Sequence, residues 1–339
     1  MLSYLHAFHA GNHADILKHA ALIQLLKKLN QKEAPYTFFD THAGSGLYST
    51  QGEKARKTGE AARGVLALAQ YASQDQNAGG QNFGLATDTG SSPKSAALAD
   101  YLDFVRPYLA RDLYPGSPLI ERAFLRPDDA HTICELHPAE FESLKENVLQ
   151  AQEGAAPNPS LATVPKNAPH TQILKADGLK TLIAQTPPKI KRGAVLIDPS
   201  YEEASDYEAV KKTVIAVHKK WSVGIIMIWY PLLAHRAAEI ENMLESIIAA
   251  AKVQNANTNI LRAEFCVDAP QSHIETSLEE NAAAKAAAAG TSNAPRLYGS
   301  GILVINAPWK LDQELDEALK HLSCVPGLAS VPSYSVTLG

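Results

Sequence analysis

The chain alternates short apolar strands with helical segments along most of its length, and this alternation limits its fold more than any other feature. Runs of β-branched and aromatic residues predict strands at 36–39, 131–134, 171–174, 194–197, 223–229, 259–266 and 301–305. Apolar residues at three- and four-residue spacing predict helices at 13–29, 138–149, 178–184, 206–220, 234–251 and 310–322. Strands that alternate with helices are typical of a parallel, doubly wound α/β sheet.

The stretch between the first two predicted strands is much longer than a simple crossover. Helical patterns at 52–72 and 95–110 occupy it, and they predict a small helical subdomain inserted after the first strand. The expected organisation is an N-terminal helix with the first strand, then the helical insertion, then the remainder of the sheet domain, at 1–50, 51–113 and 114–339.

Three further segments interrupt the alternation, and we expect them to be surface insertions. One is polar and Gly/Ser-rich, one holds several prolines and one contains an alanine run; they lie at 73–95, 151–169 and 269–296. Added loop length costs little closure entropy, so the sheet tolerates such segments. The sequence indicates no function for them.

The composition is that of an ordinary globular protein. Its 339 residues are 45% hydrophobic, enough for a sizeable core, and no apolar run approaches the roughly 18 residues of a membrane span. The N-terminus lacks the continuous apolar run of a signal peptide. Three widely spaced cysteines without a CxxC pair argue against a disulfide framework or a structural zinc site. We expect a cytoplasmic protein, monomeric and without an obligate protein partner.

The net charge of −5 is unusual for a protein that binds nucleic acid, because phosphate neutralisation normally requires a basic excess. Basic residues do gather at 27–32, 56–63, 189–192 and 211–220. Such clusters are more often solvated helix faces than binding sites. Composition alone therefore does not indicate RNA.

Candidate site residues follow the predicted strands directly, because an open α/β sheet binds ligands at the carboxyl ends of its strands. The first strand leads into a glycine-containing turn at 40–46, which lets the backbone approach a ligand but lacks the GxGxxG of a dinucleotide site. The second is followed by Glu135, an acceptor suited to both ribose hydroxyls of an adenosyl group. The third is followed by Asp177, which could accept from an adenine amine, although Asp-Gly is also a common turn.

The fourth strand ends in Asp198-Pro199-Ser200-Tyr201, the most specific of these signals. This tetrapeptide resembles the [Asn/Asp]-Pro-Pro-[Tyr/Phe] motif of amino-methyltransferases, with Ser200 in place of the second proline. The exocyclic amine of a purine is a poor nucleophile, and a carboxylate that accepts its N–H would aim the lone pair at a methyl donor. An aromatic ring such as Tyr201 would stack on a base taken out of its helix. The alternative is a strand-end turn with a buried tyrosine.

A series of short motifs resembles the bacterial 23S rRNA adenine-N6 methyltransferase family RlmJ. It begins with YLHAFHAGNHAD at 4–15 and continues at 17–19, 40–44, 114–118, 135–138, 176–178 and 229–231. The resemblance extends to about Trp309, and the motifs are specific only in combination. It implies a Rossmann-like class I methyltransferase sheet with a small helical insertion.

The same resemblance implies roles for individual residues. It assigns S-adenosylmethionine contacts to His19, His42, Ser117, Glu135, Asp177 and Gly178. It assigns catalysis to Asp198 as proton acceptor, and a substrate-side contact to Tyr4; Tyr201 is our candidate for stacking on the target base. The expected activity is methylation of an adenine N6 amine in 23S ribosomal RNA, with no metal ion.

Other interpretations stay open at this point. The histidines His6, His9, His13, His19 and His42 suggest a metal site, but a metallohydrolase helix would carry Glu after the first histidine of the His9/His13 pair. DNA adenine-N6 methylation shares the same chemistry, although the chain has no recognisable target-recognition domain for duplex DNA. A non-catalytic RNA-binding module of the same fold is the third possibility, and the acidic residues after the strands argue against it.

Overall fold

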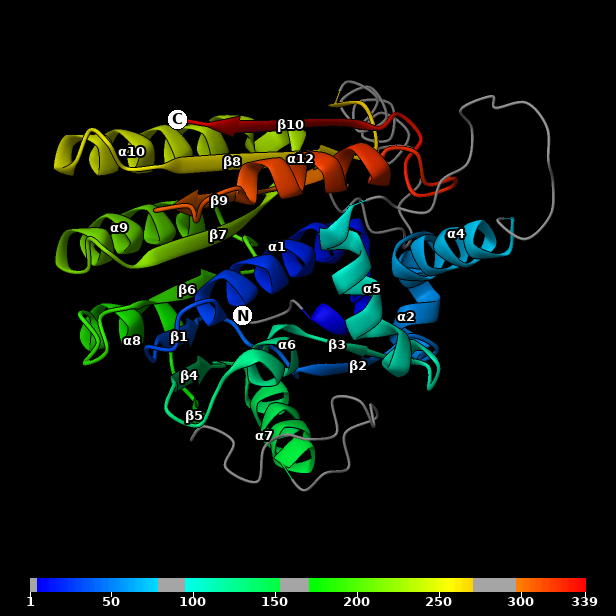
Figure 1. The fold of residues 1–339 in the computed structure, drawn as a ribbon, viewed down its shortest axis with the longest axis horizontal. Helices are drawn as coiled ribbons and strands as arrows, with labels where there is room; N and C mark the ends of the chain where they lie inside the picture. The colour runs from blue at the N-terminus through cyan, green and yellow to red at the C-terminus, as the bar shows by residue number, and fades with distance from the viewer. Residues whose placement is uncertain (1–4, 79–94, 153–170, 271–296) are drawn as a thin grey trace, which may run out of the picture.

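An eight-stranded sheet forms the centre of the protein, and helices cover both of its faces (Figure 1). The computed structural model describes residues 5–78, 95–152, 171–270 and 297–339. The strands lie in the order β10-β8-β9-β7-β6-β1-β4-β5. Their bounds are β1 Thr37–Asp40, β4 Ala130–Cys134, β5 Thr171–Leu174, β6 Gly193–Ile197, β7 Ile225–Leu232, β8 Ile260–Cys266, β9 Gly299–Ile305 and β10 Ser333–Leu338.

The strand order reverses beside β1, the position where open α/β sheets bind ligands. Strand β1 pairs in parallel with both β4 and β6, and the β4–β5 and β6–β7 pairs are parallel as well. The chain moves outward from β1 through β4 to β5 and then crosses back to β6 on the other side. Such a reversal leaves a crevice at the carboxyl ends of β1 and β6, where open α/β sheets bind ligands. The predicted Rossmann-like, doubly wound sheet is confirmed.

The far edge of the sheet differs from the parallel arrangement that we predicted. Strand β9 runs antiparallel to both β7 and β8, and β10, which the sequence did not suggest, runs antiparallel to β8. Alternation of strands and helices predicts the order of elements along the chain. It does not predict the direction in which the last strands enter the sheet.

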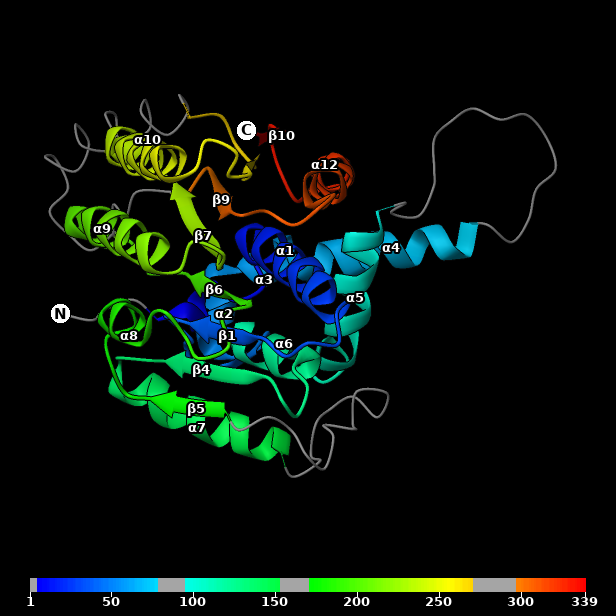
Figure 2. The same cartoon turned by 60° about the vertical axis from the view of Figure 1, so that its left-hand side comes forward.

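Two groups of helices cover the two faces (Figure 2). Helices α8 (Gly178–Gln185), α9 (Ala204–Lys220) and α10 (Ala237–Gln254) contribute to one core, and α1 (His13–Asn30), α5 (Ala96–Leu109) and α12 (Leu311–Leu322) to the other. Neighbouring strand residues alternate between the cores, as the pleat requires. Phe38 and Leu196 belong to the core that contains α1, whereas Phe39 and Val195 belong to the core that contains α9.

Helix α1 is buried on nearly all sides, although its sequence predicts an amphipathic helix. It contacts β9, α5, α12 and α6 (Ser117–Phe124). The Asn12 side chain caps its N-terminus by accepting the backbone N–H of Asp15 at 3.0 Å. Because α1 is enclosed, the polar side chains of Asp15, Lys18 and His19 are buried and need partners. Those partners form much of the site described below.

Helices occupy the stretch between β1 and β4, as predicted, but more elements lie there than the sequence suggested. The pattern at 52–72 corresponds to α2 (Glu53–Thr58), α3 (Glu60–Arg63) and α4 (Val65–Ala78). Gly59, with a φ of +64°, ends α2 in a left-handed conformation. The short strands β2 (Leu47–Ser49) and β3 (Leu113–Pro115) pair antiparallel and were not predicted, nor was α6. That 51–113 forms a separate unit stays a prediction.

Some predictions concern residues outside those described. Tyr4 is one of them, and so are most of the three suspected insertions; the start of 73–95 continues α4, and 151–152 end α7 (Pro138–Gln152). In the described parts of the chain, no helix is both long and apolar enough to cross a membrane.

Candidate active site

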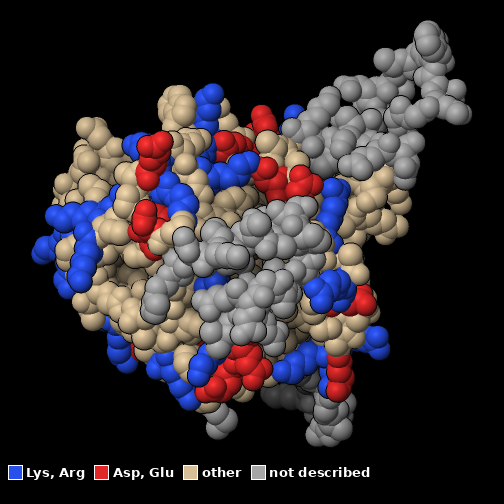
Figure 3. Space-filling model, turned by 60° about the horizontal axis from the view of Figure 1, so that its bottom comes forward, with Lys and Arg blue, Asp and Glu red and all other residues tan. Residues whose placement is uncertain are grey.

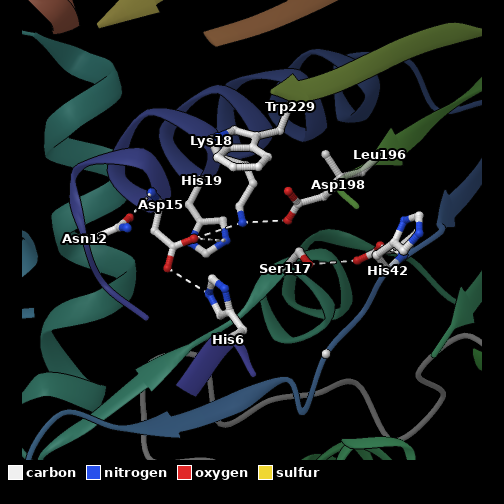
Figure 4. Close-up of polar contacts among 12 residues, drawn as sticks. His6, Asn12, Asp15, Lys18, His19, His42, Ser117, Leu196, Asp198 and Trp229 are labelled. Carbon is white, nitrogen blue, oxygen red and sulfur yellow. Dashed lines mark hydrogen bonds and ion pairs between the residues drawn. The ribbon is translucent and has the colours of Figure 1, made fainter. Parts of the chain in front are cut away.

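The catalytic candidate Asp198 lies directly after β6 and is paired with a lysine from α1 (Figure 4). Its Oδ2 accepts a hydrogen bond from Lys18 Nζ at 2.7 Å, across 180 positions of sequence. The Asp198 side chain is 14% exposed and that of Lys18 only 5%. Oδ1 of Asp198 has no hydrogen bond to any residue that the structure describes. One oxygen is therefore fixed by a cation, and the other is available to a ligand.

Lys18 belongs to a buried chain of charges. Its Nζ also contacts Asp15 Oδ1 at 2.9 Å, and Asp15 Oδ2 contacts His6 Nε2 at 3.0 Å. The Lys18 ammonium lies 5.8 Å from the ring centre of Trp229 in β7. Burial would lower the pKa of Lys18, but Asp15 and Asp198 outweigh it and hold the pKa above its ordinary value. Lys18 is therefore a permanent cation beside Asp198.

His19, a predicted cofactor contact, is held by a tyrosine. Its Nδ1 is 2.8 Å from the hydroxyl of Tyr114, and the two rings stack with centroids 5.7 Å apart. The Tyr114 hydroxyl also bonds that of Tyr101 at 3.0 Å. Burial lowers the pKa of His19 to about 3, so the ring is neutral at physiological pH.

Ser117 and His42, also predicted, meet at the end of β1 through Asp40. Ser117 Oγ donates to Asp40 Oδ2 at 2.7 Å, and the backbone N–H of His42 donates to Asp40 Oδ1 at 2.9 Å. Asp40 is fully buried, and burial raises its pKa to about 6. Burial lowers the pKa of His42 to about 4, so this ring is neutral as well.

Glu135 and the glycine turn after β1 hold each other. The Glu135 carboxylate accepts the backbone N–H of Gly44 at 2.8 Å and that of His137 at 2.7 Å. Gly44 has a φ of +59°, and a Cβ there would lie 2.2 Å from the Tyr48 hydroxyl, so only glycine fits. The glycine turn thus places its own backbone beside the Glu135 carboxylate.

Asp177 and Gly178, after β5, pack against the same turn. Asp177 caps α8 by accepting the N–H of Lys180 at 3.1 Å and also pairs with the Lys180 ammonium at 2.8 Å. A Cβ on Gly178 would lie 2.0 Å from the carbonyl oxygen of Thr41, so glycine is required for the contact. The Asp177 carboxylate opposes the fall in the pKa of His42 that burial causes. Apart from Tyr4 and Tyr201, the predicted site residues lie at the carboxyl ends of β1, β4, β5 and β6 or are linked to them by these contacts.

The residues of the crevice fit S-adenosylmethionine chemically. S-adenosylmethionine is cationic, and carboxylates at the ends of β4, β5 and β6 come from Glu135, Asp177 and Asp198. Leu136, next to Glu135, is an apolar side chain that is 46% exposed. The crevice therefore combines hydroxyl acceptors, a glycine turn and an apolar edge, as an adenosyl group requires.

Tyr201 is buried in this conformation instead of facing the crevice. Its ring is 3% exposed and packs on Tyr207 with centroids 4.7 Å apart, and its hydroxyl donates to the carbonyl oxygen of Trp229 at 2.9 Å. Its φ of +50° is uncommon for a non-glycine residue. A stacking role for Tyr201 stays a prediction, and it requires the ring to leave this position.

Replacing Tyr201 by phenylalanine is expected to lower the free energy of unfolding by about 0.5–1.5 kcal/mol, because the Trp229 carbonyl loses its donor. Chemical denaturation of the two proteins measures the difference. Methylation should be retained, since stacking depends on the ring. Unchanged stability would mean that the hydroxyl bond contributes nothing.

The N-terminal histidines His6 and His9 have separate partners instead of a common centre. His6 contacts Asp15, and His9 Nδ1 is 3.0 Å from Glu60 Oε1. His13 Nε2 is buried without a hydrogen bond. Within the described residues, no group of three or more His, Cys, Asp or Glu side chains is arranged to hold a metal ion.

The structure adds polar residues that sequence reasoning assigned no role. Lys18 and Asp15 stand within the quoted N-terminal motifs, and Asp40 starts the glycine turn. The one available signal was the row of polar residues on an otherwise apolar helix at 13–29. It does not reveal that Lys18 reaches the end of β6.

Comparisons with known proteins agree on one family. The family model "Ribosomal RNA large subunit methyltransferase D, RlmJ" matches residues 33–330. Ribosomal RNA large subunit methyltransferase J of Escherichia coli (strain K12) is 31% identical over 331 residues, which covers 96% of this chain and 95% of the relative. The Haemophilus influenzae protein of the same name is 31% identical over 329 residues, covering 95% and 93%.

A solved structure shows the same fold at lower sequence identity. A protein of family DUF519 from Legionella pneumophila str. Philadelphia 1 has a TM-score of 0.69 and 23% identity, over 98% of both chains. The family model and the two relatives carry the assignment beyond the fold. The chain belongs to the RlmJ family of ribosomal RNA large subunit methyltransferases.

Proposed function

We propose that this protein transfers a methyl group from S-adenosylmethionine to the N6 amine of an adenine in 23S ribosomal RNA, as a monomer in the cytoplasm. The observation that carries the proposal is the state of Asp198. It is a carboxylate at the end of β6 with one oxygen bound by Lys18 and the other without a partner among the described residues. The names of the relatives support ribosomal RNA as the substrate class.

In this mechanism, Asp198 activates the target amine. S-adenosylmethionine supplies a methyl group on a cationic sulfur. Asp198 Oδ1 accepts an N–H of the adenine amine, which orients the nitrogen lone pair and provides a place for the proton that leaves. Most of the rate gain comes from this positioning.

Lys18 sets the charge of Asp198. Burial raises the pKa of Asp198, and Lys18 opposes that rise by stabilising the carboxylate. The ion pair also fixes Oδ2, so that Oδ1 is the oxygen that faces the substrate. Asp15 and His6 hold Lys18 in this position.

The net charge of −5 does not attract RNA, so attraction has to come from separate groups of basic residues on the surface. In the view of Figure 3, Lys and Arg side chains lie in several separate groups with Asp and Glu between them. Some basic residues are neutralised within the protein: Lys27 pairs with Asp100, Lys28 with Glu314 and Lys211 with Glu208. We expect a modest salt dependence of RNA binding for this reason.

Replacing Glu135 by alanine is expected to weaken S-adenosylmethionine binding roughly ten- to hundredfold, because a charged acceptor at the ribose is lost. Isothermal titration calorimetry without RNA measures the effect. Glu314→Gln, which removes a carboxylate from a distant ion pair, is the matched control and should bind normally. Unchanged affinity in Glu135→Ala would place the cofactor elsewhere.

The substrate class is tested by offering several acceptors to the same enzyme. Unmodified 23S rRNA, unmodified 16S rRNA and adenine-containing duplex DNA are incubated with methyl-labelled S-adenosylmethionine. We expect label in 23S rRNA only. Preferential labelling of DNA would favour the DNA methyltransferase alternative, and cofactor binding without transfer to any acceptor would favour a non-catalytic module.

A further inference from the structure

Glu121 is a buried carboxyl group near Ser117 and Asp40, and the proposed function assigns it no role. Glu121 lies on α6 one turn after Ser117 and is 0% exposed. Its Oε2 is 2.8 Å from His131 Nε2, and the His131 side chain, on β4, is also fully buried. Its Oε1 has no hydrogen-bond donor among the described residues; the group it faces is the Asp40 carboxyl, to which it can bond only if one of the two carries a proton. Two carboxyl groups thus share one dry site.

The hydrogen bonds that lead to Glu121 form a series in which every donor points toward Glu121. It starts at Arg122, whose guanidinium can only donate; Nη1 donates to Thr171 Oγ1 at 2.6 Å. The Thr171 hydroxyl lies 3.1 Å from His131 Nδ1, to which it can give its own proton. Burial lowers the pKa of His131 to about 3, so the ring is neutral, and with Nδ1 accepting, Nε2–H donates to Glu121. Each of these hydrogen bonds then has one donor and one acceptor, and the last of them ends on Oε2 of Glu121.

The series ends at Asp40, which is ionised above its pKa of about 6. Asp40 accepts from Ser117 Oγ on Oδ2 and from the His42 N–H on Oδ1. Two buried anions side by side are unfavourable, so the pair holds one proton between them. Asp40 has two hydrogen-bond donors that stabilise its charge, whereas the unused oxygen of Glu121 is placed to carry the proton. Burial and Asp40 both raise the pKa of Glu121, in agreement with this assignment.

We infer that Glu121, supported by His131, is a neutral acid that donates to Asp40 and so fixes the direction of the Ser117 hydroxyl at the cofactor. With Asp40 ionised, Ser117 must donate to it, and the Ser117 oxygen then offers only lone pairs to the crevice. Such an oxygen suits the ammonium group of S-adenosylmethionine. The inference rests on the proposed function, because it takes the cofactor as that group. Glu121 and His131 are positioning residues.

The direction of the effect with pH follows from Asp40. The pKa of Asp40 is about 6, so below this pH Asp40 gains a proton and no longer requires the Ser117 hydrogen. Affinity for S-adenosylmethionine is therefore at its maximum well above pH 6, and it falls as the pH drops through the pKa of Asp40. The Glu121 hydrogen bond lowers the pKa of Asp40, so its loss moves the fall to higher pH. The titratable groups facing Asp40 are Asp198, Glu121 and the Cys134 thiol.

The test compares a variant that keeps the donor with one that removes it. Calorimetric affinity for S-adenosylmethionine, without RNA, is measured from pH 5 to 8 for the wild type, Glu121→Gln and Glu121→Leu. Glutamine is neutral and can donate through its amide, so Glu121→Gln should stay within roughly threefold of the wild type with the same pH midpoint. Glu121→Leu should bind roughly tenfold or more weakly at pH 7, with its midpoint at higher pH.

Three outcomes bear on the inference. If Glu121→Gln loses affinity to the same extent as Glu121→Leu, Glu121 acts as an anion and the inference is wrong. If Glu121→Leu binds with normal affinity and midpoint, Glu121 has no role at the cofactor. Should Glu121→Leu fail to fold, Glu121→Gln alone tests the inference, because an anionic role for Glu121 predicts that Glu121→Gln loses affinity for S-adenosylmethionine. A wild type that does not bind S-adenosylmethionine would refute the proposed function instead.

Discussion

Asp198→Ala is expected to lower kcat at least hundredfold while S-adenosylmethionine affinity stays within a few-fold. Proton acceptance by a positioned side chain contributes about 10²–10⁴ in rate, and this contribution exists only in the transition state. Single-turnover methylation of unmodified 23S rRNA measures the rate, and calorimetry measures the affinity. A loss confined to binding would make Asp198 a cofactor ligand instead of a catalytic residue.

Asp198→Asn refines this test. The asparagine amide oxygen can still accept an N–H from the adenine amine, but it cannot take up the proton. Its rate should therefore lie between those of the wild type and Asp198→Ala, if the two roles are separable. A wild-type rate in either variant would move the catalytic centre elsewhere.

Lys18→Met should produce the second large effect, a displaced pH profile. Removing an opposite charge at this distance raises a carboxyl pKa by about 1–3 units. Because Asp198 must be ionised to accept the proton, activity is lost as the pH falls through its pKa. The acid limb of kcat should therefore move to higher pH by a comparable amount, with a large loss of rate at pH 7.

A matched control exists on the same helix. Lys28 of α1 pairs with Glu314 at 2.8 Å, away from the crevice, so Lys28→Met removes a partly buried ion pair without touching Asp198. Its pH profile should match that of the wild type. An unshifted acid limb in Lys18→Met would show that Lys18 does not tune Asp198. Stability should also fall in Lys18→Met, since Asp15 and Asp198 lose their cation; thermal unfolding records this separately.

The parts of the fold and site that could be predicted are those with a local signature. Strands β4, β5 and β6 have apolar runs, and Glu135, Asp177 and Asp198 follow them directly. Their meeting at one crevice follows from the parallel sheet alone. Strands β2 and β3 span three residues each, too short for any periodicity to appear.

The rest depends on contacts between residues distant in sequence. The Lys18–Asp198 pair spans 180 positions, and nothing near either residue indicates it. Glu121 and His131 appear as ordinary helix and strand residues until the fold buries them together. Tyr201 illustrates a different limit, since an aromatic residue after Asp-Pro suits both base stacking and burial. Only the structure shows that it is enclosed by Tyr207 and Trp229.

The position of the transferred methyl group tests the central claim most directly. Unmodified 23S rRNA is incubated with the enzyme and methyl-labelled S-adenosylmethionine, digested to nucleosides and separated against standards. The geometry at Asp198 predicts that all label appears as N6-methyladenosine, and that Asp198→Ala yields almost none in the same time. Label on a ring carbon, a ribose or another base, or N6-methyladenosine formed equally fast by Asp198→Ala, would contradict the account.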